Sequence, residues 1–257
     1  MLSNDIISQI FLGFISFLSN FISALSGGGA GLIQLPALLF FGLPFSKALA
    51  THKVASVALG LGAGLRHFRH RTLATKLTVL ILSCGIPGVC LGSNIVLIIP
   101  DNLATISLGI LTLWLGIYSS SSKSLGITNL DKRLNQKEYI VGGIVLFLIG
   151  LVNGSLSSGT GLFVTIWLVR WFGITYTKAI GYTLILVGLF WNGTGALVLG
   201  LRSEVKWDWL PVLVIGSLFG GYLGAHFSLE KGNHLVKKSF EMISLLMGSS
   251  LIIQGII

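Results

Sequence analysis

The stretch Leu25-Ser-Gly-Gly-Gly-Ala-Gly-Leu32 interrupts an apolar segment and is followed, after more apolar residues, by Phe41-Gly-Leu-Pro-Phe-Ser-Lys-Ala48. A close counterpart occurs in the second half, where Leu156-Ser-Ser-Gly-Thr-Gly-Leu162 precedes Phe172-Gly-Ile-Thr-Tyr-Thr-Lys-Ala179. Glycines and small hydroxyls therefore stand twice where a membrane helix would continue. Non-helical backbone survives in hydrocarbon only where protein or a watery cavity satisfies it. Matched breaks in two halves of a membrane chain point to a solute-binding site.

The composition indicates a membrane protein. Of 257 residues, 53% are hydrophobic and only 10% are charged, against about 25% charged in soluble domains. Long apolar runs predict an all-α polytopic membrane protein. The formal net charge of +9 fits basic loops that orient the chain in the membrane. No basic run has the length or aromatic interleaving of a nucleic-acid surface, so we expect no nucleic-acid partner.

The apolar runs predict about five helical segments in each half. The second segment of the first half spans only ~15 Å of helix rise, too short for a ~30 Å hydrocarbon core, so we expect a half-helix or a re-entrant arm. The expected segments are about Ile6–Ala24, Leu32–Phe41, Ser46–Leu65, Thr72–Ile99, Asn102–Ser119, Tyr139–Val152, Leu162–Phe172, Thr177–Leu199, Trp207–Leu229 and His234–Ile257.

This order predicts two membrane repeats, residues 1–119 and 139–257, joined by a cytoplasmic linker at 120–138. The linker and the loop at 66–71 are rich in Lys and Arg and should lie inside. An odd number of segments per half inverts the second repeat, so we expect inverted repeats with broken or re-entrant helices. A shared Gly-x-x-x-Gly spacing, in Gly88 with Gly92 and in Gly220 with Gly224, is expected to serve helix packing.

Carboxylates are nearly absent from the apolar segments. Glu241 is about two turns into the last segment, near an interface, and the other carboxylates lie at predicted ends or loops. Pumps and cation transporters usually carry an acidic residue deep in the membrane. The pattern therefore disfavours cation substrates and a carboxylate proton relay.

A cluster of polar residues, Thr51-His52-Lys53, follows the first break. Lys47 can extend to the membrane interface, but Lys53 lies about two turns further in and needs a partner if it is buried. A bound anion is one candidate partner, and His52 could donate to a substrate, carry a proton or join two helices.

The breaks themselves can attract an anion. A helix that restarts after a break presents free N–H groups and the positive end of its dipole. Glycines leave that backbone open, although close helix packing is an alternative reason for them. The expected substrate-contacting residues are Ser26, Gly28, Gly29, Gly31, Thr51, His52, Lys53, Ser157, Ser158, Gly159, Thr160, Thr183 and Asn192. We expect no catalytic residue, no metal site and no cofactor.

Taken together, these motifs resemble the sulfite exporter TauE/SafE family of bacterial membrane proteins. The resemblance rests on the segment from Ser26 to Gly31, the short helix with Pro36, the segment from Gly42 to Ala48, Thr51-His52-Lys53, and the second-half break with the segment Gly220 to Ala225. It implies a multi-pass permease of the bacterial inner membrane for small, often sulfur-containing anions such as sulfite, sulfoacetate or related sulfonates. It further implies a secondary carrier and not an enzyme or an ATP-driven pump.

The chain departs from the family pattern at two positions. His52 stands where members often carry Asn, and Thr183 is followed by Leu184 and Ile185 where a second lysine often occurs. The expected function is alternating-access transport of a small anion. A passive anion channel on the same scaffold, or a membrane-embedded assembly factor or enzyme, remains an alternative. The sequence leaves open whether a coupling ion, a proton or sodium, and a second copy of the chain take part.

Overall fold

The computed structural model describes residues 2–68, 73–95, 101–121, 125–128, 130, 134–157 and 159–256. These residues form helices and turns, with no strand among them. Six helical stretches in this part of the chain are long and apolar enough to cross a membrane: Ser8–Ser26, Phe45–His67, Thr75–Ile95, Gln136–Leu156, Tyr176–Gly200 and Trp207–Ile253. The predicted all-α polytopic membrane fold is therefore confirmed.

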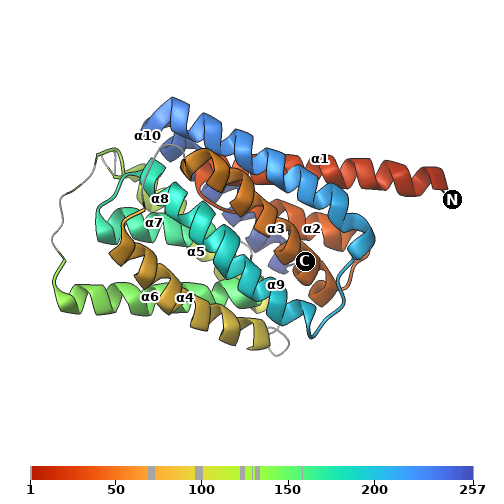
Figure 1. The fold of residues 1–257 in the computed structure, drawn as a ribbon, viewed down its shortest axis with the longest axis horizontal. Helices are drawn as coiled ribbons and strands as arrows, with labels where there is room; N and C mark the ends of the chain where they lie inside the picture. The colour runs from red at the N-terminus through yellow and green to blue at the C-terminus, as the bar shows by residue number, and fades with distance from the viewer. Residues whose placement is uncertain are drawn as a thin grey trace.

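The helices follow the predicted order (Figure 1). The first half contains α1 (Leu2–Ser26), α2 (Ala30–Phe40), α3 (Phe45–Phe68), α4 (Thr75–Ile95) and α5 (Asp101–Ser121). The second half contains α6 (Gln136–Leu156), α7 (Thr160–Phe172), a continuous run of α8 (Tyr176–Tyr182), η1 (Thr183–Trp191) and α9 (Asn192–Gly200), the short turn η2 (Trp207–Trp209), and α10 (Leu210–Ile256). The two short helices that were predicted to follow the breaks are present as α2 and α7.

Two elements differ from a plain series of α-helices. The expected helix Thr177–Leu199 contains a nine-residue π-helix, η1, between two α-helical ends. The 47 residues of α10 are interrupted at Gly232, whose φ of 74° and ψ of −173° are not helical. The last two expected segments are therefore two helices that meet at Gly232 with no loop between them.

Helix α6 begins three residues before the expected start at Tyr139. The side chain of Asn135 accepts from the backbone N–H of Glu138, and the Glu138 carboxylate accepts from the N–H of Asn135. This capping box satisfies two N–H groups at the helix start and moves it to Gln136. The non-helical part of the expected linker is correspondingly shorter.

Helices of the first half pack mainly against helices of the second half. Helix α1 packs along the first part of α10, and α6 packs along α4. A Cβ on Gly88 would lie 2.2 Å from the Phe147 carbonyl oxygen of α6, and one on Gly220 would lie 2.3 Å from the Phe17 carbonyl oxygen of α1. The glycine pairs thus serve close packing, as predicted. Two repeats related by a two-fold axis would produce such packing, and their inversion in the membrane stays a prediction.

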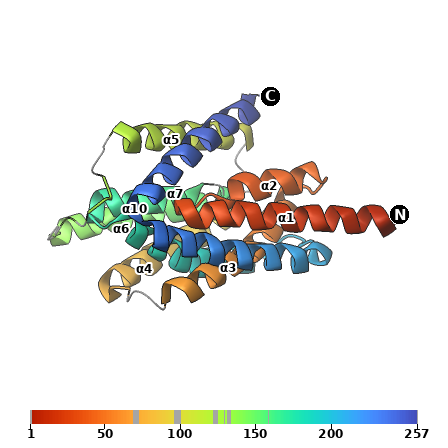
Figure 2. The same ribbon diagram turned by 90° about the horizontal axis from the view of Figure 1, so that it is seen from above.

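Helix α5 packs against the second part of α10. Figure 2 shows the second part of α10 running diagonally to α1, with α5 at the edge of the molecule and α7 beneath it. Elsewhere the bundle is crossed by α3 and by the run from α8 to α9, which pack against each other. The candidate site lies where these two runs meet the breaks before α2 and α7.

Candidate functional site

The two breaks touch each other. A Cβ on Gly28 would lie 2.4 Å from the carbonyl carbon of Gly161, and one on Gly161 would lie 2.8 Å from the Cα of Gly28. Gly28 also has a φ of 145°, a conformation that side chains with a Cβ rarely adopt. The sequence pattern therefore places two glycines where two backbones cross at van der Waals distance.

Polar side chains satisfy the backbone exposed at the breaks. Ser26 Oγ donates to the carbonyl oxygens of Ile22 and Gly28, at 2.9 and 3.1 Å. Thr165 Oγ1 of α7 contacts the Gly27 carbonyl oxygen as a donor at 2.6 Å. In the second break, Thr160 Oγ1 donates to the Ser157 carbonyl oxygen at 3.0 Å. These contacts explain how non-helical backbone is accommodated inside an apolar bundle.

Lys53 lies at the centre of the bundle on α3, with an exposed fraction of 0%. Its Nζ donates to the Asn153 carbonyl oxygen at 2.8 Å, to Asn153 Oδ1 at 2.7 Å and to Asn192 Oδ1 at 3.1 Å. All three partners are neutral oxygens, and no carboxylate is among the partners found for Lys53 in the described chain. The site therefore contains a desolvated amine whose protonated form has no compensating charge on these partners.

Asn153 connects the amine to the second break. Its Nδ2 donates to Thr160 Oγ1 at 2.8 Å, while its two oxygens accept from Lys53. Since Thr160 is the first residue of α7, one side chain joins the buried amine to the start of that helix. Gly195 on α9 leaves room for the amine, because a Cβ there would lie 3.1 Å from Lys53 Cε.

His52 belongs to a second chain of hydrogen bonds. Its Nδ1 is 2.7 Å from Gln34 Oε1 of α2, and Gln34 Nε2 donates to Ser16 Oγ of α1 at 2.9 Å. An amide oxygen can only accept, so Nδ1 is the donor in this pair. His52 thereby orients α2 against α3, in agreement with a role in joining helices.

A cavity of about 40 Å³ lies between the breaks, α3 and η1. This volume is room for a few water molecules or a small ion. It is lined by Ser23, Gly28, Gly29, Ala30, Gly31, His52, Ser56, Leu59, Asn153, Ser157, Thr160, Gly161, Thr183, Leu184, Val187, Gly188 and Asn192. The cavity wall thus comes from both halves of the chain.

Ser23 is the most informative side chain of this wall. It is 1% exposed, and its Oγ has no hydrogen-bond partner among the described residues. Leaving a buried hydroxyl unsatisfied costs roughly 1–3 kcal/mol. A hydroxyl that is kept in such a place, and that lines a polar cavity, indicates a ligand or water on that face.

The π-helix η1 forms the opposite wall. Thr183, Leu184, Val187 and Gly188 line the cavity from it. A Cβ on Gly60 of α3 would lie 2.7 Å from the carbonyl carbon of Gly188, so α3 and η1 cross closely there. π-helical segments are rare and occur frequently at functional sites.

The structure brings most of the predicted residues together. Eight line the cavity: Gly28, Gly29, Gly31, His52, Ser157, Thr160, Thr183 and Asn192. Lys53 lies beside it, bonded to Asn153 and Asn192 of the wall. The binding role of these residues stays a prediction.

Three predicted residues are placed elsewhere. Ser26 stabilises the first break from within, and Gly159 is the N-cap of α7 but not part of the cavity wall. Thr51 donates to the Lys47 carbonyl oxygen and accepts from the Lys206 N–H, on the side of α3 that faces the loop before η2. Ser158 lies outside the described residues.

Sequence reasoning missed Asn153, Ser23 and Gln34. Asn153 lies in the last turn of α6. Its position one turn before the second break, in an otherwise apolar span, was the signal that could have identified it. No group of three or more His, Cys, Asp or Glu side chains in the described ranges could hold a metal ion.

Comparison with known proteins agrees with this architecture. The family model described as "Sulfite exporter TauE/SafE" matches residues 12–251. A "Probable membrane transporter protein" of Haemophilus influenzae is 28% identical, covering 96% of this chain and 95% of the relative. The "Probable membrane transporter protein YfcA" of Escherichia coli K12 is 26% identical, with 96% and 91% covered. A Bacillus subtilis relative, "Probable membrane transporter protein YunE", is 20% identical, with 97% and 99% covered.

These relatives are named as transporters and not as enzymes. Their names agree with the multi-pass membrane architecture seen here and with a place in the bacterial inner membrane. The family match extends over both breaks and over α3 with Lys53. The chain belongs to the sulfite exporter TauE/SafE family of membrane transporters.

Proposed function

We propose that this transporter carries small, sulfur-containing anions, such as sulfite, sulfoacetate or related sulfonates, by secondary transport with alternating access. The observation that carries the proposal is Lys53, a fully buried amine held beside a polar cavity by neutral oxygens alone. A buried cation without a carboxylate is costly unless an anion compensates it. Substrate binding would supply that charge.

Two further features support an anion in the cavity. Helices α2 and α7 both begin there, at Ala30 and Thr160, and their N-caps are glycines without capping side chains. Helix N-termini favour negative charge through their N–H groups and dipole. The unpartnered Ser23 hydroxyl lines the same cavity and can donate to an oxyanion.

Alternating access would follow from movement of one half of the chain against the other, around a site built from both. The cavity is small, about 40 Å³, and lies beside the close crossings of Gly28 with Gly161 and of Gly60 with Gly188. This arrangement favours a carrier over an open pore. A channel on the same scaffold would give unitary currents in a planar bilayer, and a carrier would give saturable counterflow without them.

Counterflow of radiolabelled sulfite and of radiolabelled sulfoacetate into proteoliposomes tests the proposal. We expect saturable exchange by the wild type and its loss in Lys53→Gln. Lys47→Gln is the matched control, because Lys47 lies on the same helix but pairs with Glu204 away from the cavity. A thermal-shift measurement checks that each variant is folded and whether these anions stabilise it. Equal flux in wild type and Lys53→Gln would contradict the proposal.

A further inference from the structure

A second cavity lies where α3 ends and where α4 and α8 begin. Its volume is about 500 Å³, against about 40 Å³ for the cavity between the breaks, which we call the central cavity. We call the larger one the Lys178 cavity. The residues that line it include His67, Ala74, Leu77, Lys178, Tyr182 and Ile185. It lies beside the basic loop at 66–71, which the sequence predicts to be cytoplasmic.

The charge of Lys178 is not compensated within the described chain. Its side chain is half-buried and lines the cavity, and no described residue forms a hydrogen bond or an ion pair with its ammonium group. Lys47, at the equivalent position of the first-half motif, pairs with Glu204 at 2.7 Å. None of the described residues that line the Lys178 cavity is Asp or Glu. The cavity therefore presents positive charge to a ligand without a neighbouring carboxylate.

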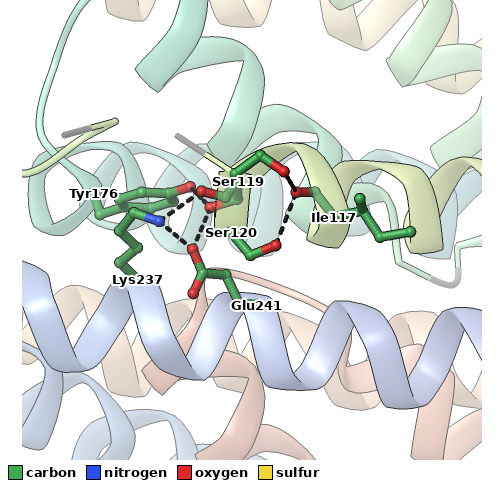
Figure 3. A network of polar contacts seen from close by, with 7 residues as sticks. Ile117, Ser119, Ser120, Tyr176, Lys237 and Glu241 are labelled. Atoms are coloured by element: carbon green, nitrogen blue, oxygen red, sulfur yellow. Dashed lines mark hydrogen bonds and ion pairs between the residues drawn. The ribbon is translucent and has the colours of Figure 1, made fainter. Parts of the chain in front are cut away.

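Figure 3 shows how the charge of another lysine near α8 is compensated. Lys237 of α10 donates to the Glu241 carboxylate and, at 2.7 Å, to the Ser119 carbonyl oxygen of α5. The hydroxyl of Tyr176, the first residue of α8, lies 2.7 Å from Ser119 Oγ and joins α8 to this network. Lys178 follows two residues later, about 200° further around the helix. The network thus holds the start of α8 on the side opposite to the Lys178 cavity.

Tyr182 adds a hydrogen-bond donor to the same cavity wall. It lies four residues after Lys178 on α8, so the two side chains are neighbours on one helix face. The Tyr182 side chain is 7% exposed, and its hydroxyl accepts from the Ala74 N–H at 2.6 Å. Within the described residues nothing accepts the hydroxyl proton of Tyr182. This proton is available to a ligand in the cavity.

The two cavities lie on either side of one helical segment. Tyr182 and Ile185 line the Lys178 cavity, and Thr183 and Leu184 line the central cavity. Ile185 packs against α3 at Gly64, where a Cβ would lie 3.8 Å from Ile185 Cγ1. The end of α8 and the start of η1 therefore form a wall that both cavities share.

We propose that the Lys178 cavity is a second binding site for the transported anion, which occupies it on the way to or from the central cavity. This inference rests on the proposed anion transport. The Lys178 ammonium and the Tyr182 hydroxyl contact the anion, and both are donors suited to the oxygens of sulfite or a sulfonate. The larger volume accommodates the anion with much of its hydration water, and the central cavity holds only a few water molecules or a small ion.

Counterflow of radiolabelled sulfoacetate, measured over a range of concentrations, provides the first test. We expect Lys178→Gln to raise the half-saturating concentration roughly threefold to tenfold, because a contact with a charged donor is lost, and to leave the maximal rate near that of the wild type. Lys178→Arg should restore the wild-type value. The control is Lys76→Gln, which changes an exposed lysine of α4 that does not line the cavity.

The outcomes separate the two proposals. An unchanged half-saturating concentration in folded Lys178→Gln, or an equal increase in Lys76→Gln, would overturn the second site and leave the proposed function intact. Absence of saturable counterflow in the wild type would overturn both.

Cysteine labelling at the inner end of the cavity provides the second test. Ile185→Cys, combined with Cys84→Ser and Cys90→Ser, is treated with methanethiosulfonates that carry a sulfonate or a quaternary ammonium group. Relative to their rates with a free thiol in solution, we expect the sulfonate reagent to react faster. Sulfoacetate should slow this reaction, and Lys178→Gln should remove the preference for the anionic reagent. The background without Ile185→Cys should stay unlabelled.

Three results of the labelling would overturn the proposal. They are equal relative rates for the two reagents, no protection by sulfoacetate, and no labelling of the folded variant. Protection by an anionic phospholipid but not by sulfoacetate would assign the cavity to a lipid headgroup and would overturn it as well.

Discussion

The backbones of Gly28 and Gly161 are so close that a single methyl group on Gly28 would lie 2.4 Å from the Gly161 carbonyl carbon. This contact joins the break after α1 to the start of α7, although the two residues lie in different halves of the chain. The cavity, the two helix starts and Lys53 are arranged around it. The geometry of the site thus depends on residues without side chains.

Gly28→Ala should therefore destabilise the fold severely. It adds a methyl group at a forbidden distance and forces a side chain into a φ of 145°; overpacking and backbone strain each cost about 1–3 kcal/mol. Gly193→Ala is the control, because a Cβ on Gly193 meets nothing within 4 Å. Thermal unfolding in detergent should show a large loss for Gly28→Ala and little change for Gly193→Ala. Equal stability would mean that the two breaks do not cross as described.

Lys53→Met should weaken anion binding by about tenfold to a hundredfold, since a hydrogen bond to a charged group contributes roughly 1.5–3 kcal/mol. The apolar side chain fills the same space but leaves the oxygens of Asn153 and Asn192 without their donor. Titration of sulfite monitored by thermal shift would measure the change. Unaltered affinity in a folded variant would remove Lys53 from the binding site.

Ser23→Ala and Ser26→Ala should have opposite effects. Ser23 Oγ makes no hydrogen bond to the described residues, so its removal should leave stability unchanged or slightly higher while weakening anion binding by several-fold. Ser26 supports the first break through two backbone oxygens, so its removal should lower stability. Measuring unfolding and anion affinity of both variants side by side separates the two roles. A stability loss in Ser23→Ala with unchanged affinity would argue against the ligand-facing hydroxyl.

The Lys47–Glu204 pair predicts a small pH dependence of stability. The hydrogen bond from Lys47, aided by its charge, lowers the pKa of Glu204 below its ordinary value of 4.5. A carboxyl with a lowered pKa in the folded state stabilises the protein above its ordinary pKa, and this contribution is lost as the pH falls through the lowered value. The difference in melting temperature between wild type and Glu204→Gln should be present at neutral pH and vanish in acid.

The matched control for this pair is Lys47→Gln. In that background, Glu204→Gln should cause no further pH-dependent change, because the interaction is already absent. The effect is expected to be small, since the pair is at the surface with Glu204 82% exposed. A difference that grows as the pH falls would contradict the sign of the shift.

The sequence predicted the helices and the breaks well because both leave local marks. Apolar runs of membrane length identify spans, and the glycines at residues 27–29 and at 159 mark backbone that leaves the helical conformation. Lys53 was identified because a lysine stands out within an apolar run. Local sequence patterns were therefore sufficient to predict the spans, the breaks and the buried lysine.

Contacts between residues far apart in the chain could not be predicted from the sequence. The bonds from Lys53 to Asn153 join residues 100 positions apart, and no local pattern connects them. The π-helix at Thr183–Trp191 has an apolar sequence that reads as ordinary α-helix. Glu241 was assigned to the membrane interface from its position alone, and its enclosure became visible only when α5 and α8 were placed beside it.

The break at Gly232 divides the 47 residues of α10 into two helical parts that pack against different helices. The part before it packs closely against α1 at Gly220 and Gly224, whereas the part after it packs against α5 at Gly248. A rotation about this one residue would move the second part of α10 together with α5 and would leave the packing of the first part against α1 unchanged. A Cβ at Gly232 meets nothing within 4 Å, but alanine would be strained at its φ of 74°. The substitution would therefore displace the backbone at this residue and change the angle between the two parts of α10.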